Sequence, residues 1–158
     1  MTNKRSKMTG ANDVANTLKM LPRGMGPALN QASRKSLQPQ LRAAKRNLKA
    51  NGNVESGDLN RSLGILRDPK SSASRPVHYV GARRSYPGWS KAHLVEFGTS
   101  PHFISSSGGW EHPGAAPHPF LTPAFTHYWR ETLNIFGREI GPAIEARAAK
   151  LAVRNKKK

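Results

Sequence analysis

The apolar positions of the first fifty residues recur at helical spacing. Val14, Leu18 and Leu21 stand at i, i+4 and i+7, which predicts a short helix ending at the Pro- and Gly-containing connection that follows. A second helix is expected from Pro27, because proline fits the first turn of a helix. Its apolar face comprises Leu29, Ala32, Leu37, Leu41, Ala44 and Leu48. Pro39 lies inside this pattern, so we expect a kink there or a break into two shorter helices.

In the middle of the chain the period changes from helix to strand. A short helical turn is expected near residue 58, capped by Ser56 or Asp58, after which Leu63 and Ile65 alternate as in a strand. The polar segment 67–74 then forms a hairpin connection to a second strand. The β-forming residues of that strand are Val77, Tyr79 and Val80. Two strands alone are marginally stable, so the sheet must pack on the helices or pair with a neighbouring chain.

Residues 86–98 are expected to form one to three helical turns, with Gly98 as the residue that ends them. Residues 99–118 follow, rich in Gly and Pro, and we interpret them as a long loop of the functional or mobile kind. Phe103 and Trp110 are its candidate partner-contact residues. A tryptophan near a loop tip either anchors a partner or packs back on its own domain, and the sequence leaves both alternatives open.

The last helix has the clearest local signals. Thr122 is expected as its N-cap and Pro123 as its first residue. Gly141 and Pro142 are expected to bend or end it. Its apolar positions are Leu121, Ala124, Phe125, Tyr128, Phe136, Ile140, Ile144, Ala148 and Leu151.

These elements predict an α+β fold, in which a small antiparallel β-sheet packs against two or three helices and the C-terminal helix is long. We expect residues 1–10 to form a disordered basic N-terminus, 11–152 a single domain and 153–158 a basic tail. A chain of 158 residues is long enough for one modest core.

Composition adds a strong charge imbalance. The formal net charge is +17, and residues 1–50 carry 11 Lys/Arg against a single acid, Asp13. Such an excess favours a polyanionic partner such as nucleic acid. The chain has no cysteine, which excludes disulfides, thiolate metal ligands and a cysteine nucleophile. No apolar run approaches the length of a membrane span, so no membrane association is expected.

The sequence gives little support for a catalytic or metal-binding site. His93 and Glu96 could share a helix face, and His112 and His118 lie across a short segment, but no pair has the spacing of a zinc motif. There is no nucleophile elbow and no phosphate-binding loop. Nine acidic residues make a site of clustered carboxylates improbable. We therefore expect no enzyme, no metal and no cofactor.

The positive charge favours nucleic-acid binding, but the sequence has no feature that would read bases. No zinc-finger spacing, aromatic strand or recognition helix is evident. Any DNA contact should be non-specific. The candidate DNA-facing residues lie on the second predicted helix: Arg42, Lys45, Arg46 and Lys49. The alternative for these residues is a charged helix face that is simply solvated.

Three short blocks, taken in order, resemble one family. They are "SGDLNRSL" with Ser56, Gly57, Leu59, Ser62 and Leu63; "EFGT" with Glu96, Phe97, Gly98 and Thr99; and "PFLTPA" with Pro119, Phe120, Leu121, Pro123 and Ala124. Each block alone is weak, but the ordered set is more specific. It resembles the neck or tail-completion proteins of long-tailed siphophages, the family of gene product ten of lambdoid phages, over about residues 12–150.

This resemblance implies a non-enzymatic virion protein, made in the host cytoplasm and located in the phage neck. It would form a ring, six-fold by preference and twelve-fold as the alternative, between the head-closure protein and the tail terminator or tail tube. Packaged DNA would pass through the lumen, in non-specific contact with basic side chains. The rival hypothesis is a small basic protein that binds DNA non-specifically.

The resemblance also gives the motif residues structural roles. Phe120 and Leu121 would hold the last helix on the sheet, and Gly98 would take a backbone conformation that a Cβ disfavours. Glu96 lies among apolar residues, so its carboxylate should accept backbone N–H bonds or meet a basic side chain. Candidates for that side chain are Arg83 and Arg84, from the same chain or a neighbouring subunit.

Overall fold

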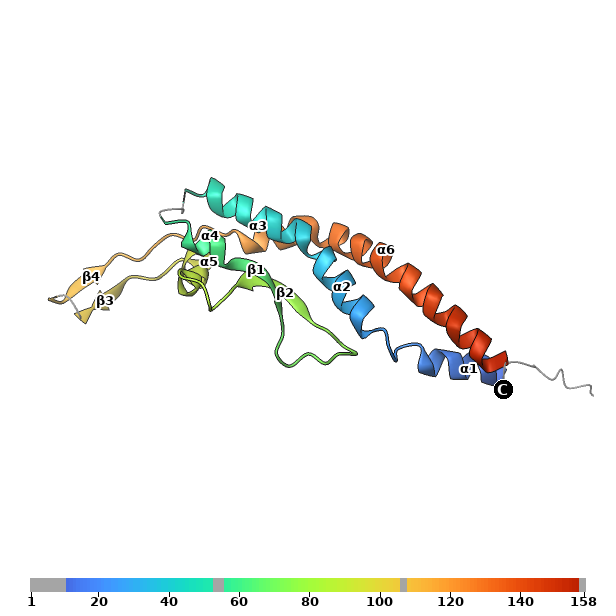
Figure 1. The fold of residues 1–158 in the computed structure, drawn as a ribbon. Helices are drawn as coiled ribbons and strands as arrows, with labels where there is room; N and C mark the ends of the chain where they lie inside the picture. Colours follow the sequence, from blue (N-terminus) through green and yellow to red (C-terminus); the bar gives the residue numbers. More distant parts are fainter. Residues whose placement is uncertain (1–10, 53–55, 106–107, 157–158) are drawn as a thin grey trace, which may run out of the picture.

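The computed structural model describes residues 11–52, 56–105 and 108–156. The long C-terminal helix α6 (Leu121–Lys156) runs from the middle of the molecule to one end, and α1 (Ala11–Met20), α2 (Gly26–Ser36) and α3 (Gln38–Ala50) pack along it one after another (Figure 1). The fold class is α+β, as predicted. The expected N-terminal segment 1–10 lies outside the described residues.

The predicted break at Pro39 is confirmed. Helix α2 ends at Ser36 and α3 begins at Gln38, with only Leu37 between them. Pro39 is the second residue of α3, where a helix needs no donor from its backbone nitrogen, so the proline costs nothing at this position. Helix α2 likewise begins next to Pro27. Placing a proline in the first turn of each helix lets the chain follow α6 in two straight segments.

The first sheet has two antiparallel strands, as expected. Helix α4 (Asp58–Ser62) leads directly into β1 (Leu63–Arg67), which pairs with β2 (His78–Ala82) in the register Leu63 to Ala82. The connection between the strands reaches the start of α2, where a Cβ on Gly26 would stand 2.4 Å from the Ala73 carbonyl oxygen. The hydroxyl of Ser33 in α2 also lies 2.7 Å from Nδ1 of His78. The sheet is therefore supported by the helices.

The segment 99–118, predicted as a long loop, contains two short strands. After a short 3-10 turn, η1 (Trp89–Lys91), and α5 (Ala92–Phe97), the chain forms a second antiparallel pair, β3 (His102–Ile104) and β4 (Trp110–His112). Apolar and aromatic residues at these positions favour strands, and Gly108 and Gly109 both adopt positive φ between them. The frequent Gly and Pro of the segment obscured this signal. Figure 1 shows the pair projecting from one end of the molecule.

Helix α6 is continuous through Pro142, so of the two expectations for this position, a bend or an end, the end is wrong. A proline inside a helix removes one backbone hydrogen bond. Ile140 and Leu151, one on each side of it, are both buried against other elements, and this packing holds the helix together. The helix extends to Lys156, so it includes most of the segment expected as a basic tail.

The core is small and rich in alanine. One cluster joins α3, α4, β1 and α6 and consists of Ala43, Ala44, Leu48, Leu59, Leu63, Phe120 and Ala124. A second cluster joins α2 and α6 through Met25, Ala32 and Ile140. Small residues let α3 approach α6 closely, but they bury little area. Many large apolar side chains of the described residues consequently remain exposed. No helix of the described ranges is long and apolar enough to cross a membrane.

Candidate functional site

Glu96 caps the long helix. Its Oε2 accepts the backbone N–H groups of Phe120 and Leu121, each at 2.8 Å, and its Oε1 accepts that of Thr122 at 2.8 Å. The first N–H groups of a helix have no intrahelical partner, and a negative charge there is favoured by the helix dipole. A carboxylate from α5, only 4 % exposed, thus satisfies three donors at the start of α6. Of the two alternatives for Glu96, backbone N–H bonding is confirmed.

The protonation of Glu96 follows from these contacts. Burial alone would raise the pKa of its carboxyl group, because the charged form loses water. Hydrogen bonding from the Thr122 side chain and from the three backbone N–H groups favours the charged form more strongly, so the net pKa lies below its usual value. The residue is therefore a carboxylate at neutral pH. With its oxygens occupied by backbone donors, it acts as a structural anion rather than a general base.

The expected capping residues of α6 are displaced by this arrangement. The helix begins at Leu121, so Thr122 and Pro123 are its second and third residues and not its N-cap and first residue. Local sequence favours a threonine cap, but the carboxylate of Glu96 binds N–H groups one turn earlier and starts the helix sooner. Pro123 needs no donor there, which keeps it compatible with the first turn.

Arg83 and Arg84, the alternative partners of Glu96, lie elsewhere. Arg83 donates to the carbonyl oxygens of Ser62 at 3.2 Å and Arg61 at 2.9 Å. Its guanidinium also lies 4.1 Å from the ring centre of Tyr86, and that of Arg84 lies 5.1 Å from the ring centre of Trp89. These contacts engage both arginines with partners other than Glu96.

The second and third motif blocks meet at the junction of α5 and α6. The Phe120 side chain is fully buried, and its carbonyl oxygen accepts the Asn47 side-chain amide at 3.1 Å. Asn51 binds the carbonyl oxygens of His118 and Pro119 at 3.1 and 3.3 Å. Asn47 lies in α3 and Asn51 is the residue that caps its C-terminus; both were missed in the sequence, because nothing local distinguishes them. They bind carbonyl oxygens of the segment that leads into α6, while Glu96 accepts its N–H groups.

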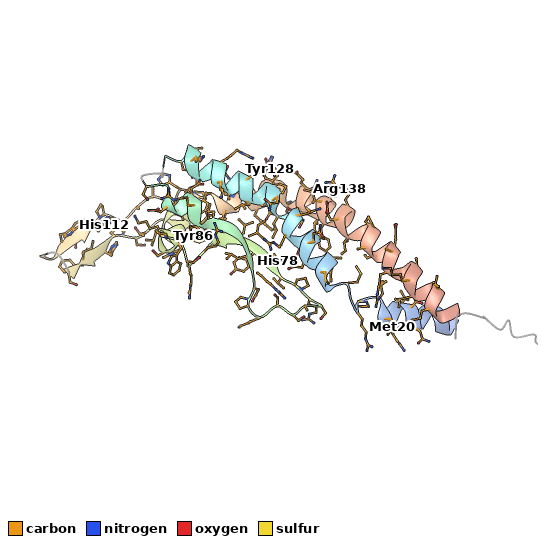
Figure 2. The ribbon with its side chains drawn as sticks, in the orientation of Figure 1. Met20, His78, Tyr86, His112, Tyr128 and Arg138 are labelled. Carbon is orange, nitrogen blue, oxygen red and sulfur yellow. The ribbon has the colours of Figure 1, made fainter. Side chains whose placement is uncertain are left out.

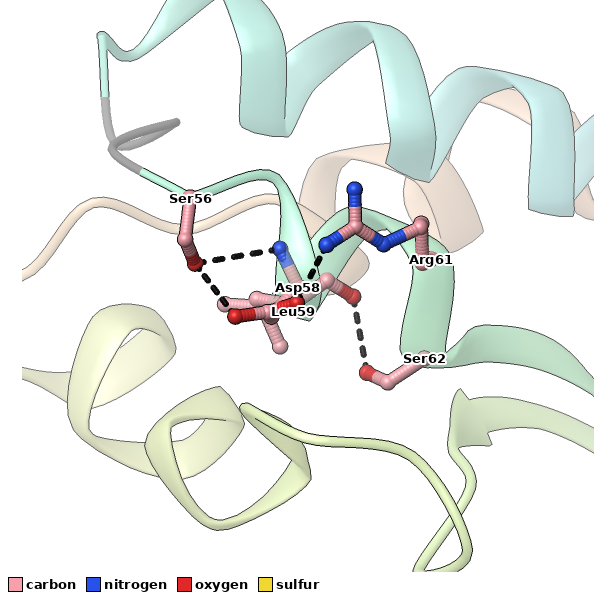
Figure 3. A network of polar contacts seen from close by, with 5 residues as sticks. All are labelled: Ser56, Asp58, Leu59, Arg61 and Ser62. Atoms are coloured by element: carbon pink, nitrogen blue, oxygen red, sulfur yellow. Dashed lines mark hydrogen bonds and ion pairs between the residues drawn. The ribbon is translucent and has the colours of Figure 1, made fainter.

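The first motif block joins the same core from α4 (Figure 3). The Ser56 hydroxyl lies 2.6 Å from Oδ2 of Asp58 and accepts the Asp58 N–H at 3.3 Å, and Arg61 forms an ion pair with the other carboxylate oxygen. The hydrogen bond from Ser56 and the contact with Arg61 lower the pKa of Asp58. Gly57 is the N-cap residue itself, with φ of 72°. Leu59, on the inner side of this turn, packs in the cluster that holds Phe120.

Gly98 and Thr99 join α5 to the projecting strands. Gly98 has φ of 71°, and a Cβ there would stand 2.4 Å from the Ala115 carbonyl oxygen. Thr99 and Ala115 exchange two backbone hydrogen bonds, at 2.9 and 3.0 Å. The glycine therefore permits the close approach that closes the base of the arm. Phe97, within the same motif, is 75 % exposed and takes no part in the core.

Residues 99–105 and 108–115 project from the body, and we call them the hairpin arm; they carry the two candidate partner-contact residues in exposed positions. Phe103 is 65 % and Trp110 46 % exposed. His102 and His112 face each other across the strands with ring centres 5.1 Å apart, and His112 stands on the arm far from the helices (Figure 2). Trp110 therefore does not pack back on the body of its own subunit.

No group of three or more His, Asp or Glu side chains able to hold a metal occurs among the described residues. Two histidines of the segment that follows α5 make local backbone contacts. Nδ1 of His102 lies 2.9 Å from the Ser100 carbonyl oxygen, and Nδ1 of His112 accepts the Gly114 N–H at 3.0 Å.

The candidate DNA-facing residues share one face of α3. Arg42, Arg46 and Lys49 are exposed and Lys45 is half-buried. Arg46 donates to the Tyr128 hydroxyl at 2.9 Å, so this side chain is held against α6, where Tyr128 lies beside α3 (Figure 2). The four positive charges form a short basic ridge next to a groove of about 470 Å³ between α3 and the first turns of α6.

A further surface was missed in the sequence. Phe125, Trp129 and Leu133 stand one turn apart on α6 and are 62, 42 and 61 % exposed. We call them the α6 stripe. Phe125 and Ile144 had been placed on the inward face, but the buried side of α6 turns along its length as the helix passes from α3 to α2, which leaves both exposed.

Comparison of the chain with protein-family models, with curated proteins and with solved structures found no match.

Proposed function

We propose that the protein is a structural component of the neck of a tailed bacteriophage. The observation that carries the proposal is the convergence of the three motif blocks on one junction. Glu96 of the second block caps the helix that the third block opens, and Leu59 of the first packs in the same core as Phe120. Residues that are far apart in the sequence thus act as one structural unit, as expected of a shared architecture.

The positive charge of the chain supports a position of the ring around DNA. A ring whose lumen carries the basic ridge of α3, with Arg42, Lys45, Arg46 and Lys49, would attract the phosphate backbone without reading bases. We propose six copies in the ring, with twelve as the alternative. The net charge of +17 would then be partly offset by packaged DNA, which reduces repulsion between subunits.

The partners proposed are the head-closure protein on one side and the tail terminator or tail tube on the other. A protein in this position needs exposed apolar surfaces, and large exposed side chains are abundant on the described residues. The proposal assigns no catalytic residue. The only buried carboxylate of the described residues, Glu96, is committed to backbone N–H groups.

Electron microscopy of virions tests the proposal. A phage carrying this gene with a small C-terminal tag should be labelled at the junction of head and tail. A phage lacking the gene should accumulate filled heads and separate tails. Label on the capsid or at the tail tip, or normal joining without the gene, would exclude the neck assignment.

The basic ridge also favours the second candidate, a DNA-binding protein that acts outside a virion. Quadruple replacement of Arg42, Lys45, Arg46 and Lys49 by alanine should then reduce the slope of log K against log salt for duplex DNA by up to about 3.6, because each phosphate contact contributes about 0.9. Tight, steeply salt-dependent binding by a monomer would favour this candidate over the ring. Weak binding by an oligomer would favour the neck.

A further inference from the structure

Several exposed apolar side chains, among them Phe103, Trp110 and Phe125, lie in a stretch of sequence that has no positive charge. Residues 92–129 contain no Lys or Arg, although the chain has 26 of them. The two acids of this stretch are Glu96, which is buried, and Glu111, which is exposed on the hairpin arm. Two copies of a chain with net charge +17 repel each other over most of their surfaces. A contact between copies meets less repulsion where its surfaces carry few positive charges, as on the hairpin arm.

The hairpin arm is the first surface in this stretch. It projects away from α6 (Figure 1), and β3 and β4 pair with each other without packing extensively on any other element. A two-stranded hairpin alone is marginally stable in water. Phe103 and Trp110 stay exposed on it, and aromatic residues of this kind are enriched in the centres of protein interfaces. The arm therefore has the composition and the reach of an element that a partner surface stabilises.

The α6 stripe is the second surface. Phe125 also lines a groove of about 250 Å³ between α6 and β2, whose other apolar walls include Leu37, Val80 and Leu121. The stripe and the groove adjoin, because both contain Phe125. Arg130 borders the stripe, with its guanidinium 5.1 Å from the ring centre of Trp129. The result is an apolar surface with a groove at one end and a positive charge at its edge.

We propose that the hairpin arm of one copy docks edge-on against the α6 stripe and groove of a second copy, with Phe103 on one face of the arm and Trp110 on the other, as the strand register places them. The charges match, since Glu111 faces Phe103 across the arm and can meet Arg130 of the other copy. The two surfaces are different, so the contact repeats head to tail and closes into a ring if the rotation between copies allows. The inference rests on the proposed ring and supplies its contact between subunits.

Sedimentation velocity of the full chain tests the docking. Trp110→Ala removes a ring from the arm and Trp129→Ala removes one from the stripe, and each should weaken self-association by about tenfold or more. Val153→Ala is the matched control, because Val153 is a similarly exposed apolar residue near the other end of α6. It should associate like wild type. A monomeric wild-type protein, or unchanged association of both tryptophan variants, would overturn the proposal.

Mixing the two tryptophan variants distinguishes this contact from a symmetric one. Trp110→Ala keeps an intact stripe and Trp129→Ala keeps an intact arm, so an equimolar mixture should form a 1:1 dimer that grows no further. If arms met arms, Trp129→Ala alone would still dimerise fully. That result would refute docking of the arm on α6. All variants alter exposed side chains, and circular dichroism should show unchanged helix content.

Disulfide trapping gives a readout that does not depend on loss of binding. The chain has no cysteine, so a double variant Glu111→Cys, Arg130→Cys, which keeps the aromatic side chains of both surfaces, should form a ladder of cross-linked oligomers under mild oxidation. Each single variant should give no cross-link, and a mixture of the two should stop at a dimer. Rings that form without this cross-link would refute the contact but leave the neck assignment standing. Cross-linked oligomers in a protein absent from the virion neck would refute the assignment and leave the contact standing.

Discussion

Replacement of Glu96 by alanine should destabilise the protein strongly. The change leaves three backbone N–H groups at the start of α6 without their acceptor, and that of Phe120 is buried. A hydrogen bond to a charged group contributes about 1.5–3 kcal/mol, and loss of a cap costs about 0.5–2 kcal/mol. These contributions overlap, and water can reach part of the first turn. We expect a loss of about 3–4 kcal/mol in the free energy of unfolding.

Glu96→Gln should cost less, about 1–2 kcal/mol. Its amide oxygen can still accept the N–H groups of Phe120 and Leu121 in the position of Oε2, but its NH₂ group would face the Thr122 N–H, which is also a donor. Urea unfolding followed by circular dichroism at 222 nm measures both variants. Glu131→Gln, an exposed carboxylate on α6, is the control and should lie within about 0.5 kcal/mol of wild type. Glu96→Ala within that same range would refute the capping role.

Acid sensitivity gives an independent check of the same carboxylate. The pKa of Glu96 is lower in the folded protein than its ordinary value of 4.5. Its contribution is therefore present above pH 4.5 and is lost as the pH falls through the folded-state pKa. The difference in unfolding free energy between wild type and Glu96→Gln should shrink over that interval. A difference that stays constant from pH 7 to below the folded-state pKa would exclude a charge effect.

Three other substitutions have defined outcomes in the same unfolding assay. Phe120→Ala should cost about 3–5 kcal/mol, because its ring is fully buried, and near-wild-type stability would contradict its central place. Gly98→Ala should cost more than about 1 kcal/mol, since φ is 71° and the new Cβ meets the Ala115 carbonyl oxygen; an unchanged midpoint would contradict this strain. Pro142→Ala should instead stabilise α6 by about 1–3 kcal/mol, and a loss of stability would show that the proline is favourable where it stands.

The features predicted correctly from the sequence are those that local chemistry decides. Pro39 breaks the helix because its own ring excludes the preceding turn, and Gly98 ends α5 because it can take positive φ. Pro142 carries the same local signal, yet α6 continues through it, because packing on both sides outweighs one lost hydrogen bond. Whether a proline breaks a helix thus depends on contacts that the local sequence does not contain.

The capping of α6 shows the same limit in the site. The local sequence predicted Thr122 as the N-cap of α6. Instead the carboxylate of Glu96, 26 residues before Thr122, accepts the N–H groups at the start of the helix. The sequence indicated correctly that Glu96 needs N–H donors, because a carboxylate among apolar neighbours must be satisfied, but it could not indicate which ones. The hairpin arm was obscured by its glycines. The α6 stripe was obscured because the buried side of a long helix changes as its neighbours change.

The length of α6 sets a scale for any assembly built from this chain. At a rise of 1.5 Å per residue, its 36 residues span about 54 Å. If the helices stood parallel to the axis of a ring, the ring would be at least that tall and would enclose about 16 base pairs of duplex, at 3.4 Å for each pair. If they lay across the axis, the ring would be flat and wide. The height of the particle in a low-resolution image therefore gives the orientation of every subunit within it.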